Sequence, residues 1–388
     1  MDITIYPGKL RGSITAIPSK SQAHRLLICA AFADGPTTLL CPETNRDIEA
    51  TAECLRALGT NIQRTETGYT VVPAREIPNG AYLNCCESGS TLRFILPIVG
   101  ALGVKATIKM EGRLPLRPLS PLWEEMERMG CSLSRPTANT ILCTGKLRPG
   151  AYTIAGNVSS QFITGLLFAM DLIDGPCTLQ ITERIESAPY IHMTKAVLEL
   201  FGENRHSPGT VTVEGDWSNA AFFLAANCLG CDVTVTNLNP DSPQGDRAVA
   251  FWLTKLVREK CIIPAADIPD LVPILSVVAA CSKGAVFTDI QRLRIKESDR
   301  VASVIAMLES LGGQAEATDD TLTVLGTGLT GGTVSSFNDH RIAMSAAIAA
   351  TVCSNPVTIL GAQCVEKSYP IFFEEYSRLG GNYEQHLR

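Results

Sequence analysis

One pattern of polar and apolar positions recurs along this chain: a short polar or charged segment, an apolar segment, a break, and a strand-like segment rich in β-branched residues. In the first copy, the polar segment spans 18–25, the apolar segment spans 26–33, and the strand-like segment is Thr37–Leu40. Small polar side chains can accept hydrogen bonds from the free N–H groups at the start of a helix, and a Gly-Pro pair stops a helix. The pattern therefore predicts a helix with a polar N-terminal end, followed by a strand.

The pattern occurs six times, at a spacing of roughly 50–70 residues, which is typical of an internal repeat. The apolar segments of the other five copies are Phe94–Ala101, Phe162–Ala169, Ala220–Ala226, Val272–Ala280 and Ile342–Ala350. These segments are apolar on nearly all sides rather than along one stripe, so we expect them to form buried central helices with sheets outside them. Between the copies, the helical spacing of apolar residues predicts outer amphipathic helices at 47–59, 121–130, 193–202, 249–256 and 299–312.

The length of the chain, 388 residues, favours two domains rather than one. With three copies of the repeat in each, the first domain is expected at 13–213 and the second at 1–12 plus 214–388. The N-terminal segment is predicted to form a strand. If this strand joins the sheet of the second domain, the chain crosses between the domains twice, near 12–18 and 212–215. Such a double crossing predicts a hinge that closes over ligands.

The polar segments indicate the charge of the ligand. The N-terminal end of a buried helix carries free N–H groups and the positive end of the helix dipole, and both attract anions, phosphates above all. If the helices run parallel in each domain, these ends would converge on one anion-binding cleft. The alternative is that the segments only cap the helices, but capping does not explain the Lys, Arg and His residues that several of them contain.

Composition narrows the classes of function. The chain is 45% hydrophobic and has a net charge of −6, which argues against a general nucleic-acid binder but not against a small anion held by local Arg and Lys residues. No apolar run is as long as a membrane span, and the start Met1–Ile5 lacks the basic and apolar regions of a signal peptide. A cytoplasmic enzyme or binding protein without a membrane partner is therefore expected.

The 14 cysteines lie mostly in apolar stretches, where a free thiol acts as a small hydrophobic residue, so disulfides are not expected. Cys228 and Cys231 have the spacing of a redox or metal pair, but neither a second pair nor a His cluster accompanies them. A helix-to-strand corner is the favoured interpretation, and no metal site is predicted.

Three further segments carry residues suited to chemistry. Two arginines lie on a Pro-stiffened stretch at Glu111–Pro118, which could also be an ordinary solvated loop. Five charged residues lie within Leu293–Arg300, where opposite charges can tune a Lys–Glu pair for proton transfer or simply begin a helix. Lys367 follows the last predicted strand of the repeat, where a surface lysine is the alternative interpretation.

Ten short motifs occur in the order found in the EPSP synthase (3-phosphoshikimate 1-carboxyvinyltransferase) family, which this sequence resembles over essentially its whole length. The motifs are Ser19–Arg25, Ser88–Arg93, Arg113–Pro118, Ser159–Gln161, Ser187–Tyr190, Glu214–Asp216, Pro269–Asp270, Leu293–Arg300, Asn338–Arg341 and Lys367–Pro370. Each motif alone is weak, whereas ten in order are specific. The resemblance implies an α/β fold of two domains, each with three βαββαβ-type units, in which outer sheets surround parallel buried helices in an inside-out, barrel-like arrangement.

The resemblance also implies the reaction. The 5-hydroxyl of shikimate-3-phosphate would attack C2 of phosphoenolpyruvate while C3 is protonated, and the tetrahedral intermediate would then lose phosphate to leave an enol ether. Asp270 would be the base, Glu297 the proton donor to C3, and Lys20 would contact both substrates. Neither a metal nor an organic cofactor is implied, and the family is usually monomeric.

The resemblance assigns the binding contacts position by position. The residues expected to hold shikimate-3-phosphate are Lys20, Ser21, Arg25, Ser159, Ser160, Gln161, Ser187, Asp270 and Lys296. The residues expected to hold phosphoenolpyruvate are Lys20, Gly89, Arg117, Gln161, Arg300, Arg341 and Lys367. The planar fork of an arginine suits this task because it matches carboxylate and phosphate geometry. His340 is expected to line the same cleft.

One departure from the family pattern concerns Glu87. Many members carry Asn-Ala-Gly-Thr where this chain has Glu87-Ser88-Gly89-Ser90. A carboxylate close to an anion site is expected to turn away from it or to pair with an arginine. The departure bears on sensitivity to glyphosate-like mimics of phosphoenolpyruvate more than on the reaction itself.

Three alternatives compete with this interpretation. The UDP-N-acetylglucosamine enolpyruvyl transferases share the fold and the donor, but they would carry Lys-Asn in the first polar segment and usually a Cys in the loop at 113–117, and neither is present. An RNA-end-processing enzyme on a related fold is disfavoured by the acidic net charge and the lack of a nucleotide loop. A non-catalytic anion-binding relative is disfavoured because both Asp270 and Glu297 are present.

Overall fold

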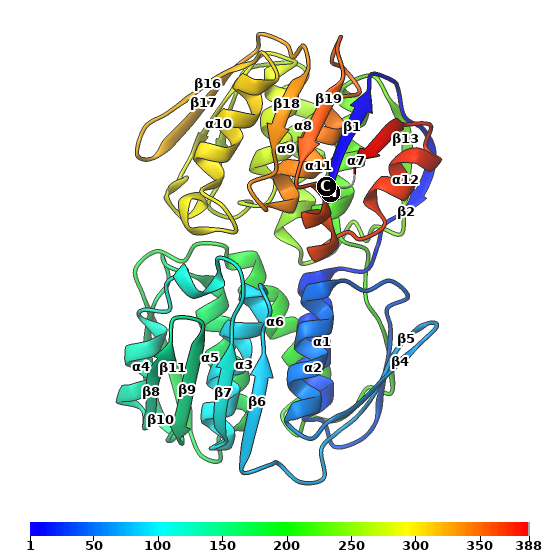
Figure 1. Cartoon of the computed structure of the whole chain (residues 1–388). Coiled ribbons are helices and arrows are strands. Elements are labelled where there is room, and N and C mark those ends of the chain that lie inside the picture. Colours follow the sequence, from blue (N-terminus) through cyan, green and yellow to red (C-terminus); the bar gives the residue numbers. More distant parts are fainter. Residues whose placement is uncertain (387–388) are drawn as a thin grey trace. The chain divides into compact units, whose positions relative to one another are not determined.

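The computed structural model describes residues 1–386 and divides the chain into two compact units (Figure 1). The central unit is Pro18–Val213, and the terminal unit joins Met1–Ile17 to Glu214–Arg388. Residues 13–17, expected with the first domain, belong to the terminal unit because β2 (Arg11–Thr15) pairs in parallel with β13 (Asp232–Thr236).

The central unit has three sheets, with the strand orders β12-β3-β5-β4, β6-β7-β9-β8 and β10-β11. Its strands are β3 Thr37–Leu40, β4 Asn61–Thr65, β5 Gly68–Val72, β6 Gly80–Asn84, β7 Lys105–Lys109, β8 Cys131–Thr137, β9 Thr140–Gly145, β10 Gly150–Ala155, β11 Cys177–Thr182 and β12 Thr210–Thr212. Its helices are α1 Lys20–Ala31, α2 Arg46–Ala57, α3 Gly89–Leu102, the 3-10 helix η1 Leu114–Leu116, α4 Leu122–Arg128, α5 Ser160–Leu172 and α6 Ala188–Phe201.

The terminal unit also has three sheets, with the orders β18-β19-β1-β20, β14-β15-β17-β16 and β13-β2. Its other strands are β1 Asp2–Tyr6, β14 Cys261–Pro264, β15 Ala285–Thr288, β16 Gln314–Ala317, β17 Thr321–Leu325, β18 Gly332–Ser335, β19 Val357–Leu360 and β20 Asn382–His386. Its helices are α7 Trp217–Cys228, η2 Gly245–Ala248, α8 Val249–Leu256, α9 Val272–Ala280, η3 Gln291–Ile295, α10 Arg300–Ser310, α11 His340–Ala349, η4 Ala362–Lys367 and α12 Phe372–Arg378.

The predicted repeat and fold class are confirmed. The six apolar segments form α1, α3, α5, α7, α9 and α11, and each helix is followed by a strand. Every residue of α9 and of α11 is buried, as expected for helices that are apolar on all sides. The sheets around them are open rather than closed into a barrel in the part of the chain that is described. Each unit thus buries its own helical core beneath separate sheets.

The chain exchanges strands between distant parts of the sequence. The N-terminal segment forms two strands, β1 and β2, rather than the single strand predicted, because Pro7 and Gly8 interrupt it. β1 lies between β19 and β20 and is antiparallel to both, with Asp2 opposite His386. In the central unit, β12 pairs in parallel with β3 although the two strands are far apart in sequence. The sheets are therefore completed by long-range pairing.

Two of the six sheets have only two strands, which the sequence pattern did not indicate. In three of the other four, an antiparallel hairpin follows the outer helix and completes a four-stranded sheet. In the fourth, β1 and β20 from opposite ends of the chain complete the sheet. After α6, the chain instead leads through residues 202–209 directly to β12, and after α8 it reaches β14 through residues 257–260. These connections are too short to include a hairpin.

Each unit has its own hydrophobic core, built from its central helices and the inner faces of its sheets. Cys228 ends α7, Cys231 lies just before β13, and both are free thiols, so the predicted helix-to-strand corner is confirmed. Among residues 1–386, no helix combines the length and the hydropathy that a membrane crossing requires.

Candidate active site

The polar segments lie further inside the helices than the sequence pattern indicated. Ser19 and Ser88 are the N-cap residues of α1 and α3, and each side chain accepts a hydrogen bond from a backbone N–H of the first turn. Arg25 and Arg93 therefore lie within buried helices rather than before them. Small N-cap residues allow the helix to begin early, so long polar side chains are held at its buried first turns.

The N-terminal ends of α1, α5 and α6 meet in the central unit. Arg25 of α1, which is only 2% exposed, donates from Nε to Oγ1 of Thr194 at 2.8 Å and from Nη2 to the carbonyl of Tyr190 at 2.9 Å, both in α6. Its Nη1 donates to the carbonyl of Ser21 at 2.6 Å. Burial lowers the pKa of Arg25 to about 10, so this side chain stays charged at neutral pH.

A second set of contacts joins the starts of α1, α2 and α3. Nζ of Lys20 lies 3.1 Å from Oδ2 of Asp47, and both side chains remain partly exposed. Nδ1 of His24 lies 2.7 Å from Oγ1 of Thr51, which lies 2.7 Å from Oγ1 of Thr91. Burial, together with the charges of Lys20 and Arg25, holds the pKa of His24 well below its usual value, so this imidazole is neutral. The network fixes three helix starts relative to one another.

Gly89, the first residue of α3, lies directly beneath two guanidinium groups. A Cβ atom at this position would lie 2.6 Å from Nη1 of Arg117 and 2.7 Å from Nη1 of Arg93. Arg93 itself donates to the carbonyls of Gly89 and Pro118, at 3.3 and 3.1 Å. The absence of a side chain at Gly89 lets both positive charges approach the helix N-terminus, which suits an anion.

The starts of α5 and α6 hold the other residues assigned to the central unit. Ser159 caps α5, Ser160 is buried, and Nε2 of Gln161 donates to Oγ of Ser90 at 3.0 Å. Ser187, the N-cap residue of α6, is buried and adopts a left-handed backbone with φ = 59°. A non-glycine residue in this conformation is strained, and such strain is concentrated at functional sites.

In the terminal unit, one buried arginine binds three carboxylates. Arg300 is 1% exposed and contacts Oδ1 of Asp270 at 2.5 Å, Oε2 of Glu297 at 2.8 Å and Oδ2 of Asp339 at 2.9 Å. Asp339 is fully buried and caps α11, whereas Asp270 and Glu297 are 22% and 27% exposed. The two carboxylates assigned to proton transfer are therefore accessible from solvent, and the group that holds them is not.

Asp270 is shared by two arginines. Its Oδ2 lies 3.1 Å from Nη2 of Arg341, whose Nη1 donates to the carbonyl of Ser218 at 3.0 Å. Burial would raise the pKa of Asp270, but the charges of Arg341, Arg300 and Lys296 outweigh it and hold this pKa well below its usual value. Within residues 1–386, Nε of Arg341 has no hydrogen-bond acceptor. The same guanidinium can thus hold Asp270 and receive an anion.

The remaining assigned residues surround this cluster. Burial lowers the pKa of Lys296 to about 8. Nζ of Lys367, at the end of η4, donates to the carbonyl of Asn338 at 2.9 Å, just before α11. His340 is the first residue of α11 and is buried. The predicted residues thus form two sets, one at the helix starts of the central unit and one at those of the terminal unit.

Among the charged residues of these clusters, Asp47, Arg93 and Asp339 received no role from the sequence. Neither did Asp246, a buried carboxylate in η2 whose charge acts on Arg341. In sequence, Asp339 is indistinguishable from an ordinary N-cap residue, a role that it also plays, and Asp47 from an acidic residue of a first helical turn. Arg93 and Asp339 occur within motifs of the family, which could have drawn attention to them. Asp246 occurs in none of these motifs.

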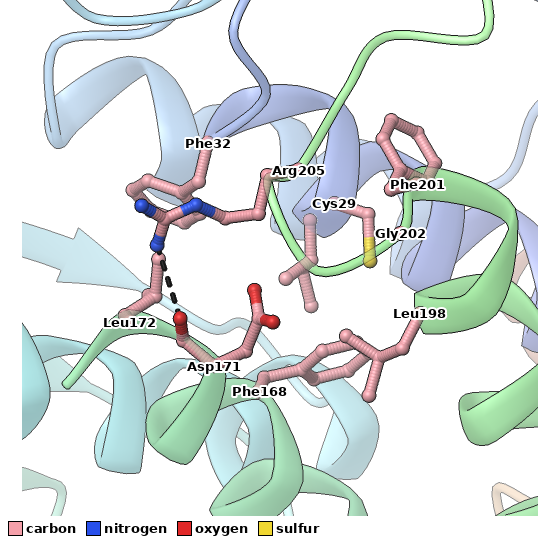
Figure 2. Close-up of a pocket in the computed structure, with 10 residues that line it drawn as sticks. Cys29, Phe32, Phe168, Asp171, Leu172, Leu198, Phe201, Gly202 and Arg205 are labelled. Carbon is pink, nitrogen blue, oxygen red and sulfur yellow. Dashed lines mark hydrogen bonds between the residues drawn. The ribbon is translucent and has the colours of Figure 1, made fainter. Parts of the chain in front are cut away.

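A small apolar pocket in the central unit lies away from these residues (Figure 2). It is lined from the C-terminal ends of α1, α5 and α6, including Cys29, Phe168 and Phe201, whereas the polar clusters lie at the N-terminal ends. Arg205 donates to the backbone carbonyl of Asp171 at its edge. Its volume of about 10 Å³ is barely enough to hold one water molecule, so it is not a substrate site.

Glu87 lies against Gly112, in the turn between β7 and η1, and a Cβ atom at Gly112 would clash with its carboxylate. The carboxylate of this family-divergent residue thus lies beside the backbone just before Arg113.

Chemically, the arrangement offers two solvent-accessible carboxylates and several fixed cations. Residues 1–386 contain no group of three His, Cys, Asp or Glu side chains placed to hold a metal ion. Fixed guanidinium and ammonium groups can stabilise anionic substrates and charge that develops in a transition state.

Comparisons with known proteins agree with this description. The family model for EPSP synthase (3-phosphoshikimate 1-carboxyvinyltransferase) matches residues 5–376. The 3-phosphoshikimate 1-carboxyvinyltransferase of Clostridium kluyveri is 35% identical over 99% of this chain and 98% of its own length, and that of Clostridium perfringens (strain 13) is 37% identical over 98% of both.

Two solved structures resemble the fold at low sequence identity. The EPSP synthase of Acinetobacter baumannii has a TM-score of 0.79 at 23% identity, covering 99% of this chain and 100% of that one. The enolpyruvyl transferase NikO from Streptomyces tendae has a TM-score of 0.76 at 17% identity, covering 99% and 98%. The family model and the curated relatives cover nearly the whole chain. This chain therefore belongs to the EPSP synthase (3-phosphoshikimate 1-carboxyvinyltransferase) family.

Proposed function

We propose that this protein is a transferase that moves the enolpyruvyl group of phosphoenolpyruvate to the 5-hydroxyl of shikimate-3-phosphate, releasing phosphate, in the biosynthesis of aromatic amino acids. The hydroxyl oxygen bonds to C2 of phosphoenolpyruvate while C3 gains a proton. The tetrahedral intermediate then loses phosphate and a proton from C3 to give the enol ether. The reaction needs a base, an acid and cations for two phosphates and two carboxylates, and no cofactor is included in the proposal.

The observation that carries this proposal is the cluster of Asp270, Glu297, Arg300 and Arg341 in the terminal unit. It combines two solvent-accessible carboxylates with two buried guanidinium groups within hydrogen-bonding distance of them. In the proposed mechanism, Asp270 takes the hydroxyl proton and Glu297 delivers the proton to C3.

An anion bound to Arg341 and Arg300 would withdraw part of their charge from Asp270. Its pKa would then rise toward a value at which it can accept a proton, because opposite charges are what hold that pKa down. Binding of phosphoenolpyruvate would in this way prepare the base.

The binding contacts are proposed as assigned from the family motifs. For phosphoenolpyruvate they are Lys20, Gly89, Arg117, Gln161, Arg300, Arg341 and Lys367. For shikimate-3-phosphate they are Lys20, Ser21, Arg25, Ser159, Ser160, Gln161, Ser187, Asp270 and Lys296. We further propose that the central and terminal units are the two domains, that the crossings at Ile17–Pro18 and Val213–Glu214 form the hinge, and that the protein is a cytoplasmic monomer.

The test is phosphate release from phosphoenolpyruvate with shikimate-3-phosphate or UDP-N-acetylglucosamine as the acceptor, in separate reactions. Release only with shikimate-3-phosphate is the expected result. Release only with the sugar nucleotide would keep the donor and replace the acceptor contacts. A folded protein that releases phosphate with neither acceptor would instead be a non-catalytic relative.

Replacing Gly89 by Ala is expected to raise KM for phosphoenolpyruvate about 10- to 100-fold, since a displaced charge-assisted hydrogen bond is worth about 1.5–3 kcal/mol. The new methyl group would overlap Nη1 of Arg117 and of Arg93, the mobile ends of long side chains, so the guanidinium groups move and the fold is kept. KM for shikimate-3-phosphate and the melting temperature should change little. Gly35→Ala is the control, because a Cβ there meets nothing closer than 3.9 Å. Equal effects of the two substitutions would contradict the assignment of Arg117.

Affinity for shikimate-3-phosphate is expected to fall as the pH rises through about 8. Burial lowers the pKa of Lys296 to about 8, so its ammonium is charged below that pH and neutral above it. In Lys296→Arg the charge persists, because the guanidinium pKa exceeds about 12. KM for shikimate-3-phosphate, measured for both proteins between about pH 7 and about pH 9, should therefore rise in the wild type and stay flat in the variant. Parallel profiles would exclude Lys296 from the contacts with shikimate-3-phosphate.

A further inference from the structure

Asp246 is a buried carboxylate that the proposed mechanism does not use. It lies in the 3-10 helix η2, is 2% exposed, and its Oδ2 accepts a hydrogen bond from Oγ of Ser218 in the first turn of α7. A buried carboxylate is costly unless nearby groups compensate its charge, so its presence beside the active-site cluster calls for a role.

Ser218 connects Asp246 to Arg341. The hydroxyl of Ser218 donates to Asp246, while its backbone carbonyl accepts from Nη1 of Arg341 at 3.0 Å. Nη2 of the same arginine contacts Asp270 at 3.1 Å. Asp246 therefore fixes the helical turn whose carbonyl orients the guanidinium.

The segment that carries Asp246 is itself held firmly against α7. Oε1 of Gln244 accepts from the backbone N–H of Trp217 at 3.1 Å, and its Nε2 donates to the carbonyl of Gly215 at 2.9 Å. Gln244 thus anchors the chain two residues before Asp246. The carboxylate is consequently a fixed charge rather than a mobile one.

The charges around Asp246 make its ionisation sensitive to the ligand of Arg341. Burial and the charge of Asp270 raise the pKa of Asp246 to about 7, against the opposing effects of Arg341 and the Ser218 hydrogen bond, and Asp216 adds a smaller upward effect. In return, Asp270, Asp246 and Asp216 raise the pKa of Arg341 against the effect of burial and of Arg300. Asp246 and Arg341 therefore influence each other electrostatically.

We propose that Asp246 is a positioning residue for the donor substrate: it orients Arg341 through Ser218, and its charge competes with the phosphoenolpyruvate anion for that guanidinium. The inference rests on the proposed function. Asp246 is neutral below about pH 7 and ionised above it. When ionised, it offsets part of the positive charge of Arg341, so affinity for phosphoenolpyruvate falls as the pH rises. By linkage, binding of the anion favours protonation of Asp246.

Asp246→Asn tests this proposal, because Asn keeps the size of the side chain and can accept from Ser218 but stays neutral. KM for phosphoenolpyruvate is measured for both proteins between about pH 6 and about pH 8, with saturating shikimate-3-phosphate. The ratio of the two KM values at each pH cancels the titration of the substrate phosphates, whose second pKa is about 6. The ratio of wild type to variant is expected to rise about 5- to 20-fold across this range. The corresponding ratio of KM values for shikimate-3-phosphate should stay constant, because Lys296 titrates alike in both proteins.

Two further variants complete the experiment. Asp241→Asn removes an exposed carboxylate from the same segment and should reproduce the wild-type profile. Ser218→Ala removes the hydroxyl that lowers the pKa of Asp246, so the rise in KM should move to higher pH, and this variant also serves if Asp246→Asn does not fold. If the wild type is active but the KM ratio for phosphoenolpyruvate does not depend on pH, this inference is overturned while the proposed function stands. The same holds if the pH profile of Ser218→Ala is not shifted. A wild type without turnover overturns the proposed function and this inference with it.

Discussion

Asp270→Asn is expected to lower kcat by about 10²–10⁴-fold, the usual contribution of a positioned base. The amide cannot take the proton of the 5-hydroxyl, but its oxygen can still accept from Arg341, and its size fits the space of the carboxylate. Loss of the charge also removes an internal competitor for Arg300 and Arg341, so KM for phosphoenolpyruvate should not rise. The decisive measurement is steady-state phosphate release, with kcat and both KM values determined separately.

The control for this substitution is Asp267→Asn, which removes an exposed carboxylate three residues earlier in the same segment. Glu297→Gln is the companion variant and should also lose about 10²–10⁴-fold in kcat if it removes the acid that protonates C3. A wild-type rate in both catalytic variants would show that proton transfer uses other groups. A loss of binding in place of kcat would mean that the carboxylates act only as ligands of the arginines.

Arg300→Met is expected to reduce the free energy of unfolding by about 3–5 kcal/mol, the cost of leaving buried partners of a salt bridge uncompensated. Asp339 is fully buried, and removal of the guanidinium strips it, together with Asp270 and Glu297, of their shared cation. Arg300→Lys should recover only part of the loss, because a single ammonium cannot match the fork that reaches three carboxylates. Urea unfolding followed by circular dichroism measures the difference.

The stability that Arg300→Met loses depends on pH, and the direction follows from the pKa of Asp270. The arginines hold the folded-state pKa of Asp270 well below its usual value, so its contribution to stability is present above the unfolded pKa of about 3.9 and is lost as the pH falls through the folded pKa. The difference between wild type and Arg300→Met should therefore narrow below about pH 4.

Arg378→Met is the matched control, because Arg378 pairs with Glu375 on the exposed surface of the same unit. Exposed pairs contribute about 0–1 kcal/mol. Similar losses in the two variants would contradict a central electrostatic role for Arg300.

The sequence predicted the elements whose burial leaves a strong local pattern. Helices such as α9 and α11 are apolar on every side, and the outer helices show a single apolar stripe, so both kinds could be recognised without any tertiary information. The pairing of strands from distant parts of the sequence could not be recognised in this way. β2 and β12 are short, and their partners β13 and β3 are selected by long-range pairing that no local pattern encodes.

In the candidate site, too, the sequence predicted the residues that a local motif marks and not those that only tertiary contacts bring in. Lys20, Arg117 and Asp270 were assigned because they occur in ordered family motifs. The carboxylates that compensate cations of the site were missed: Asp47 beside Lys20, Asp339 beside Arg300, and Asp246, whose charge acts on Arg341. In sequence, each looks like any acidic residue close to the start of a helix. Only the distances distinguish the two roles.

The position of β1 and β2 in the sheets affects the order in which the parts of the chain can fold during synthesis. The central unit is complete once β12 has emerged from the ribosome, so it can fold while the rest of the chain is still being made. The first seventeen residues, in contrast, have their partners in β13, β19 and β20, the last of which ends at His386. At about 5–20 residues per second, these first-made strands wait roughly 20–70 s for the last-made one. Domain folding in the cell is therefore expected to proceed from the middle of the chain outward, with the N-terminus incorporated last.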